Sequence, residues 1–363
     1  MKHRFVELYG LTAALASDQT ITIDLNMRSP ISQLIIDSRV LNGAQASSTD
    51  HPLAGLTKVE IVDGSDVLFS LDGFELQALD IYDSGIHPRG GWFNYLPGTE
   101  TDAQVAMSFG RYLWDEILAF DPGKFLNPQL KITIDEDGGG MNSSGMKLSV
   151  LAAMFDEVPP SPTGFLMTKE LKRWTKTAAG HEYTDCPLDY PYRKLFLQSR
   201  YAGSPPHWCF SNIKLSSDQD KKVILNGEFR DLMFGIGREN AFIKELLTSG
   251  AQAAKKIGHC TPTMDVMGTA NQWRDDSAGG AIGTYNGDGG QYEWRSEQAH
   301  NAVHHIQGWA PHGTLCIPFG KQGIIEDWFD VKKDIGSLVL DATSGVTLAT
   351  QKLFIQQMRT YAG

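Results

Sequence analysis

Residues 109–135 read FGRYLWDEILAFDPGKFLNPQLKITID, and most of this stretch returns near the C-terminus. The second copy reads FGK at 319–321, IIEDWF at 324–329 and SLVLD at 337–341. The copies stay in step, because the offset is 210 residues from 109 to 319 and 211 residues from 113 to 324. The chain therefore looks like two versions of one domain.

Each copy contains two apolar, two acidic and two apolar residues in succession. Apolar residues at i, i+1, i+4 and i+5 share one face of a helix, which leaves the acids on the opposite face. The pattern predicts short amphipathic helices over 111–121 and 322–330, each before a late strand. Because the acids recur in equivalent helices, we interpret Asp115 and Glu116 as part of a solvated face and not as a catalytic pair.

Four further blocks support the duplication, and they occur in the same order in both halves. They are PISQLIIDSR at 30–39 with PYRKLFLQSR at 191–200, KVEIV at 58–62 with NIKLS at 212–216, VLFSL at 67–71 with VILNG at 223–227, and KLSVLAAM at 147–154 with KLFIQQMR at 352–359. Each short match is weak alone, but a collinear series is typical of an internal repeat.

Length and composition agree with two domains. The chain has 363 residues, and one hydrophobic core usually stops growing at roughly 250 to 300 residues. The 37 glycines and 16 prolines favour many turns between short strands. We expect an N-terminal arm or helix at 1–18, a first domain at 19–158, a linker at 159–182 and a second domain at 183–363. The linker contains the proline-rich VPPSPTG.

A large insertion separates the copies of the middle and late blocks. The offset jumps from 156 to 210 residues, which places an inserted loop at 235–312 of the second domain. Residues 240–257 are expected to form a helix at its start. The later part interleaves glycines with aromatic residues, which favours a projecting recognition loop. The candidate residues for recognition in an exposed loop are Trp273, Tyr285, Tyr292 and Trp294.

Several functional classes are disfavoured. A net charge of −11 argues against binding nucleic acid through the bulk surface, because phosphate neutralisation needs clustered Lys and Arg. The four cysteines lie far apart without a CxxC pair, so free thiols in a reducing compartment are expected. No window approaches 18 uninterrupted apolar residues, and no signal peptide follows the first residues. We therefore expect a soluble protein made in a cytoplasm.

About eight short strands per copy, with antiparallel turns, indicate an all-β fold of two tandem eight-stranded jelly rolls. This tandem pair, with its Pro-rich joint and paired helices, resembles the double jelly-roll major capsid proteins of the tectivirus and adenovirus lineage. Tailless icosahedral phages with an internal membrane are the most similar group. The resemblance rests on the copies that begin at Pro30 and Pro191 and on the helices predicted at 111–121 and 322–330.

The resemblance implies a structural role. In that family three chains form a pseudo-hexagonal homotrimer that tiles an icosahedral shell in the virion, assembled here in a host cytoplasm. The insertion at 235–312 would form an outer tower. The implied partners are other copies of the chain, minor capsid or penton proteins and an internal lipid membrane, with no direct sequence-specific binding of nucleic acid. Residues 1–17 either pack on their own domain or reach a neighbour or the lipid surface.

A metal site is the weaker interpretation of one histidine-rich segment. Glu297, His300 and His304 would share one face if this segment were helical, and such a face could hold a divalent metal. The segment lacks the glutamate next to the first histidine that a metalloprotease requires, because Asn301 stands there. We expect surface or interface histidines, with no metal and no cofactor.

Two other functions remain open at this point. The tryptophans and tyrosines of the insertion could form a sugar platform, on a tandem β-sandwich that binds carbohydrate or acts on glycans. A receptor-binding spike is the other alternative. No nucleophile motif stands out in the sequence, so we expect a protein that is not an enzyme.

Overall fold

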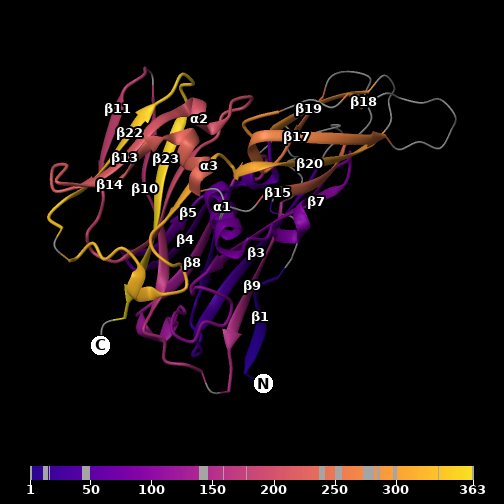
Figure 1. The fold of residues 1–363 in the computed structure, drawn as a ribbon. Helices are drawn as coiled ribbons and strands as arrows, with labels where there is room; N and C mark the ends of the chain where they lie inside the picture. Colours follow the sequence, from indigo (N-terminus) through magenta and orange to yellow (C-terminus); the bar gives the residue numbers. More distant parts are fainter. Residues whose placement is uncertain are drawn as a thin grey trace.

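The computed structural model of the chain describes residues 2–10, 15, 17–42, 50–138, 146–157, 159–176, 178–236, 242–249, 256–272, 282–283, 287–296, 301–333 and 335–361. Figure 1 shows two bodies of β-strands side by side, with the insertion projecting at one end and both termini at the other. Within the described residues, no helix is both long and apolar enough to cross a membrane.

The first half forms two four-stranded arrays from eight strands. Their bounds are β1 (His3–Tyr9), β2 (Gln19–Asp24), β3 (Ile31–Leu41), β4 (Leu56–Asp63), β5 (Asp66–Leu71), β7 (Glu100–Ser108), β8 (Pro128–Ile134) and β9 (Lys147–Phe155). One array has the order β1-β9-β3-β7 and the other β2-β8-β4-β5. Strands β7 and β8 alternate between buried and less buried residues, as expected when one face of a strand covers a core.

The second half repeats this arrangement. Its strands are β10 (Gly164–Thr175), β11 (His181–Asp185), β12 (Tyr192–Ser199), β13 (Phe210–Ser217), β14 (Lys222–Glu228), β21 (Thr314–Pro318), β22 (Leu338–Ser344) and β23 (Thr350–Thr360). They pair in the orders β10-β23-β12-β21 and β11-β22-β13-β14. Numbered within each half, both halves have the orders 1-8-3-6 and 2-7-4-5. The prediction of two tandem eight-stranded jelly rolls is confirmed.

The sequence blocks that suggested a duplication fall on equivalent strands. They lie on β3 and β12, on β4 and β13, on β5 and β14, on β8 and β22, and on β9 and β23. The repeat therefore reflects shared architecture and not a chance similarity of short apolar runs.

The two jelly rolls share one continuous sheet. Strand β5 of the first pairs in parallel with β10 of the second, and this joins two four-stranded arrays into one eight-stranded sheet. The main core cluster also crosses the boundary, because Phe165, Phe196 and Phe354 of the second half belong to it. The halves therefore form one packed unit.

Helices occupy equivalent places in the two halves, but not the predicted places. Helix α1 (Gly73–Ser84) follows β5, and helix α3 (Phe229–Ile236) follows β14. Asp72 caps α1 in a reciprocal capping box with Glu75, and Gly85 ends it in the left-handed conformation. Three short helical turns lie in loops between strands: η1 (Pro52–Gly55), η2 (Pro88–Gly91) and α2 (Pro206–Cys209).

The helices predicted over 111–121 and 322–330 are absent. The first segment is a loop followed by the 3-10 turn η3 (Pro122–Lys124), and the second contains only the 3-10 turn η5 (Ile325–Asp327). Trp114 has a φ of 69°, which no α-helix accommodates. Asp115, expected on a solvated face, is 0% exposed and accepts the backbone N–H of Arg111 and of Ile117.

The expected arm and linker are strands. Residues 3–9 form β1, which pairs antiparallel with β9 of the same jelly roll, so this part of the 1–18 segment is no free arm. Half of the 159–182 linker belongs to β10, which pairs with β23 over its whole length. The first five residues of β10 are buried, because they cover the core between the halves.

The insertion builds a sheet that also takes in β6 of the first jelly roll, and the described residues of 240–257 form strands in place of the expected helix. Within 240–257, the described residues form β15 (Ile243–Ser249) and the start of β16 (Lys256–His259). Strand β15 pairs with β20 (Ala302–Pro311), β20 with β17 (Pro262–Gln272), and β15 also with β6 (Trp92–Tyr95) from the first jelly roll. Strands β18 (Ile282–Gly283) and β19 (Gln291–Ser296) complete a smaller sheet with β16.

Candidate functional surfaces

The aromatic residues expected in an exposed recognition loop are only partly described. Trp273 and Tyr285 lie outside the described residues, and Trp294 is described only as part of the backbone of β19. Tyr292, on the same strand, is 0% exposed and belongs to the main core cluster. The prediction is therefore wrong for Tyr292, because alternate residues of a strand face opposite sides and Tyr292 faces the core.

Of the three metal candidates, the structure places only His304, and it lies in a strand and not on the predicted helix face. Glu297 and His300 lie outside the described residues, while His304 lies in strand β20 and is 1% exposed. Its Nε2 lies 2.8 Å from Oγ of Ser249. Burial, together with the charge of His305, lowers the pKa of His304 to about 4. A buried neutral histidine in a sheet is a packed side chain and not an exposed interface residue.

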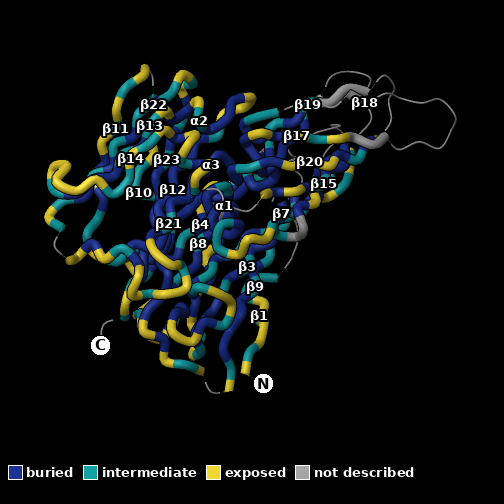
Figure 2. Tube along the Cα trace, in the orientation of Figure 1, coloured by how far each residue is buried: buried dark blue, intermediate teal, exposed yellow. Residues whose placement is uncertain are grey.

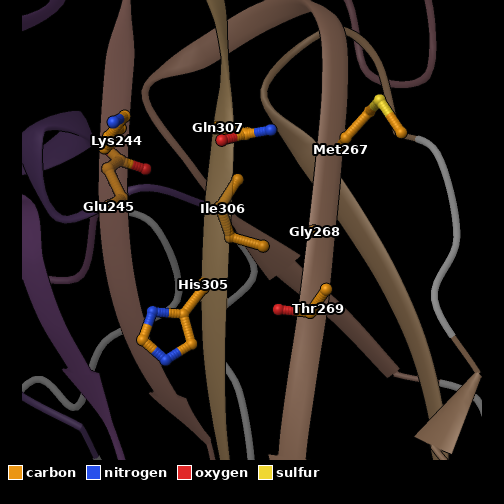
Figure 3. Close-up of a pocket in the computed structure, with 8 residues that line it drawn as sticks. All are labelled: Lys244, Glu245, Met267, Gly268, Thr269, His305, Ile306 and Gln307. Atoms are coloured by element: carbon orange, nitrogen blue, oxygen red, sulfur yellow. The ribbon is translucent and has the colours of Figure 1, made fainter.

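One face of the insertion sheet is open and hollowed. The hollow has a volume of about 410 Å³ and lies across β15, β20 and β17 (Figure 3). It is lined by Lys244, Glu245, Met267, Gly268, Thr269, His305, Ile306 and Gln307. Trp92 of β6 is paired with Leu246 of β15 and is 52% exposed beside this face. The structure thus presents an uncovered sheet, with mixed apolar and polar side chains, on the projecting part of the molecule.

A buried ion cluster fixes helix α1 against the second jelly roll. Asp83, near the C-terminal end of α1, accepts hydrogen bonds from Arg193 Nη1 at 2.7 Å, from Lys194 Nζ at 2.5 Å and from Gln356 Nε2 at 2.8 Å. Burial alone would raise the pKa of Asp83, but the charges of Lys194 and Arg193 lower it to about 2. Tyr82 adds a bond of 2.6 Å to the carbonyl oxygen of Thr314.

Sequence reasoning missed this cluster, although the sequence contains a signal for it. Arg193 and Lys194 stand side by side in β12, and every residue of that strand is buried. Two cations within a buried strand require a carboxylate partner, because an unpaired buried charge is strongly unfavourable. The partner, Asp83, lies more than 100 positions earlier in the chain and could not be identified from spacing.

A second cluster lies at the N-terminal end of α1. Asp72, Glu75 and Glu170 each have a carboxylate oxygen within 4.8 Å of the others, which is the closest approach to a metal-ligand set among the described residues. Arg173 and Lys352 already contact Asp72, so two cations occupy the place of a metal ion. Burial and the charge of Asp72 raise the pKa of Glu75, which favours a proton there. The cluster therefore fits an internal clasp better than a metal site.

Exposed apolar side chains gather at the end that carries both termini. Two loops form this end, residues 109–127 after β7 and residues 319–333 after β21, and together with the start of β1 we call this region the base. Figure 2 shows long exposed stretches along it. Its large exposed apolar residues are Phe5, Tyr112, Leu113, Ile117, Leu126 and Ile324.

The base is one continuous surface. The ring of Phe5 on β1 lies 5.8 Å from that of Trp114 in the first loop. Arg111 of the first loop donates a 2.9 Å hydrogen bond to the carbonyl oxygen of Gly323 in the second. Leu118 and Trp328, one from each loop, share a buried cluster beneath. The exposed apolar groups thus belong to neighbouring segments and not to scattered parts of the surface.

Comparison with known proteins identifies the fold. No family model and no curated protein matches the chain. Among solved structures, the major capsid protein P2 of bacteriophage PM2 is 11% identical with a TM-score of 0.57, covering 99% of this chain and 98% of that chain. The STIV major capsid protein is 12% identical with a TM-score of 0.57 over the same shares. VP54 of PBCV-1, as fitted into the virophage Sputnik, is 8% identical with a TM-score of 0.60, covering 98% and 93%. These likenesses show a double jelly-roll fold over nearly the whole chain.

Proposed function

We propose that this chain is the major capsid protein of an icosahedral virus, and that three copies form a pseudo-hexagonal block. The observation that carries the proposal is the matched strand order of the two halves, which lie side by side and share one sheet. Three such chains bring together six nearly equivalent jelly rolls. A ring of six equivalent units is the shape that tiles a surface with hexagonal contacts.

The chemistry of such a protein is the burial of its own surfaces and not catalysis. Obligate assemblies bury on the order of 2,000 Å² or more at each interface. The partners are other copies of the chain and the minor or penton proteins of the shell, and the protein resides in the virion after assembly in the host cytoplasm. We assign no role in sequence-specific binding of nucleic acid, in agreement with the net charge of −11.

The mass of the purified full-length chain tests the assembly. Three chains of 40.0 kDa make a particle of about 120 kDa by light scattering. A homogeneous particle of one chain at high concentration contradicts the proposal. Sugar binding by such a monomer would instead support the carbohydrate-binding alternative.

We also propose that the base faces a lipid membrane beneath the shell. A contiguous group of exposed large apolar residues is characteristic of protein or membrane contacts. In this fold the base carries both termini, at the end opposite the insertion (Figure 1). The projecting insertion sheet would then point outward.

Flotation with phosphatidylcholine vesicles tests the membrane contact. We expect the wild-type protein to float with the vesicles and the double variant Ile117→Ser/Leu126→Ser to float several-fold less, because less apolar surface enters the lipid. Val346→Ser is the matched control, since Val346 is 84% exposed in the turn between β22 and β23, away from the base. Equal flotation of all three proteins, or none, contradicts the assignment.

A further inference from the structure

Four histidines gather where the insertion meets both jelly rolls. They lie before η1 (His51), at the start of η2 (His87), at the end of β16 (His259) and in the turn between β20 and β21 (His312). Their side chains are at most 7% exposed. The ring centroids of His51 and His312 are 4.9 Å apart. Histidines from four separate segments of the chain thus meet in the interior.

Hydrogen bonds fix the tautomer of His51. The backbone N–H of Leu53 donates to its Nδ1 at 3.3 Å, so this nitrogen carries no proton. Nε2 therefore carries the ring proton and faces Oγ1 of Thr261 at 3.4 Å. A second proton can bind only at Nδ1, where it would face the N–H of Leu53 instead of an acceptor.

His312 is restricted in the same way. Its Nε2 lies 2.8 Å from Oε1 of Gln77, and an amide oxygen only accepts, so Nε2 carries the proton. The amide nitrogen of Gln77 points elsewhere, to the carbonyl oxygen of Gln104. Among the described residues, Nδ1 of His312 has no hydrogen-bond partner. A second proton on His312 would therefore create a buried N–H without an acceptor, which is costly.

The surroundings of His87 favour a positive charge on its ring. Its Nδ1 lies 2.8 Å from the carbonyl oxygen of Pro88, and its Nε2 lies 2.8 Å from Oε1 of Glu245. Both ring nitrogens face acceptors, as in an imidazolium. Burial opposes this charge, but the hydrogen bond and the charge of Glu245 outweigh it and raise the pKa of His87. Glu245 also accepts the backbone N–H of Thr261 at 3.0 Å, so it ties the insertion to η2.

Further charged groups face the histidines from the surrounding elements. Arg200 forms an ion pair with Asp50 at 2.5 Å, and Asp50 also lies 3.7 Å from Nδ1 of His259. The charge of Lys352 on β23 acts on His312, and the charge of Asp80 on α1 acts on His87. Protonation of His51 and His312 would add two positive charges beside Arg200 and His87. Among the described residues, Glu245 is the one carboxylate in direct contact with His87, and it is already paired.

We propose that this cluster is an acid-operated latch: when His51 and His312 each take up a proton, the insertion separates from helix α1 and the first jelly roll. The contacts that would break include those of Thr261 with His51 and Gln77, and that of Glu245 with His87. Full separation would also break the pairing of β15 with β6. The latch goes beyond the proposed role in building a shell, because a rigid capsid subunit needs no contact that opens with pH. It gives the projecting sheet two states, a closed state near neutral pH and an open state at acidic pH.

The direction of the pH dependence follows from the two neutral histidines. Burial, and then the positive charges around them, lower the pKa of His51 and of His312 well below the ordinary value of 6.5. The closed state therefore binds fewer protons than the open state below about pH 6.5. Each histidine that is exposed on opening then raises the opening equilibrium about tenfold per pH unit, so two raise it about 100-fold.

The other titrating groups do not cancel this effect. His87 has a raised pKa, so its contribution to closing is complete below pH 6.5 and is lost only as the pH rises through that raised value. The pKa of Asp80 is about 7, chiefly because of burial, but Asp80 accepts the backbone N–H of Ala106 within the first jelly roll and stays there when the insertion moves. The joint is therefore tightest near neutral pH and opens on acidification.

Hydrogen exchange of the full-length protein between pH 7 and pH 5 tests the latch. The reporting amides lie on both sides of the contact between the insertion and the first jelly roll. Leu53 donates to His51 in the first jelly roll, whereas Thr261 donates to Glu245 and His312 donates to Thr261 in the insertion. After correction for the pH dependence of the chemical exchange rate, we expect their opening equilibrium to rise about 100-fold per pH unit below pH 6. Amides of β11, the edge strand that pairs with β22 in the second jelly roll, should show no such rise.

Three variants separate the latch from general acid destabilisation. His51→Asn keeps an acceptor for the N–H of Leu53, and His312→Gln keeps a donor to Gln77, so their combination should remove the steep pH dependence. The single variant His312→Gln should reduce it to about tenfold per pH unit. His305→Gln, an exposed histidine of the same insertion, should behave as wild type. The proposal is overturned if the opening equilibrium of the wild-type protein does not rise below pH 6, or if the double variant shows the same rise.

Discussion

Two glycines show the duplication at the scale of single residues. A Cβ on Gly110 would meet the carbonyl oxygen of Leu118, and one on Gly320 would meet the carbonyl oxygen of Asp327. Each base loop folds back on the glycine that opens it. A carboxylate then caps the next residue in both loops, since Asp115 accepts the N–H of Arg111 and Asp327 that of Lys321. The repeated motif is thus a loop closure and not a helix.

Gly320→Ala should destabilise the protein by about 2 kcal/mol or more. Gly320 has a φ of 65°, which costs a residue with a Cβ about 1 kcal/mol, and the overlap with Asp327 adds a packing penalty of similar size. Urea unfolding at a fixed chain concentration measures the change. Gly323→Ala in the same loop is the control, because its Cβ meets nothing within 4 Å, and it should change stability by less than about 0.5 kcal/mol. Equal effects of the two substitutions would refute this account of the loop.

Individual residues were the least predictable level of the structure. The sequence shows that Phe109 and Gly110 recur at the same place in the second half. It predicts, however, that Asp115 faces solvent, whereas the structure buries this residue. Tyr292 was grouped with exposed aromatics because it lies among glycines, whereas pairing of β19 turns it toward the core. Which face of a strand is buried depends on its partners, and these come from distant parts of the chain.

At the scale of elements, helix α1 is the connection between the two jelly rolls. Its first turn belongs to a cluster with Arg173 and Lys352 of the second half, and its last turn to the cluster of Asp83 with Arg193 and Lys194. Both ends of one helix are therefore held by charges from the partner domain. This fixes the relative orientation of the two jelly rolls on which a pseudo-hexagonal block depends.

Asp83→Asn should cost about 3 to 5 kcal/mol, because it leaves Arg193 and Lys194 buried without their carboxylate. The folded pKa of Asp83 is about 2, below the unfolded value, so its stabilisation is complete above about pH 4 and is lost as the pH falls through 2. The difference between wild type and variant in urea unfolding should therefore shrink over this range. Asp220→Asn removes an exposed ion pair with Lys214 and should reduce stability far less than Asp83→Asn, because solvent screens that pair. A variant at position 83 as stable as this control at pH 7 would contradict the role of Asp83 as the partner of Arg193 and Lys194.

The sequence predicted strands far better than helices. The strand blocks were long enough, and repeated well enough, to fall on equivalent strands of both halves. The six-residue pattern at 113–118 spans less than two helical turns, so loop closure by Asp115 prevailed over its helical periodicity. Residues 240–257 contain good helix formers, but pairing of β15 with β20 and β6 prevailed over that propensity.

At the scale of the whole molecule, the chain is two matched sandwiches joined into one sheet, with a base at one end and an inserted sheet at the other. The order of the repeated blocks predicted the two matched sandwiches, because collinear similarity needs no knowledge of contacts, but it did not predict that they share one sheet. The buried cluster around Asp83 and the four histidines beside the insertion could not be predicted, because their residues are far apart in the sequence and only folding brings them together. The two ends differ in character, which suits a block with one face toward lipid and one outward.

Electron microscopy of the purified full-length protein tests the central claim most directly. We expect three-fold particles with a hexagonal outline, in which six jelly rolls surround the axis and the inserted sheets project from one face. Single-chain particles, or an assembly whose jelly rolls do not form a ring of six, would contradict it.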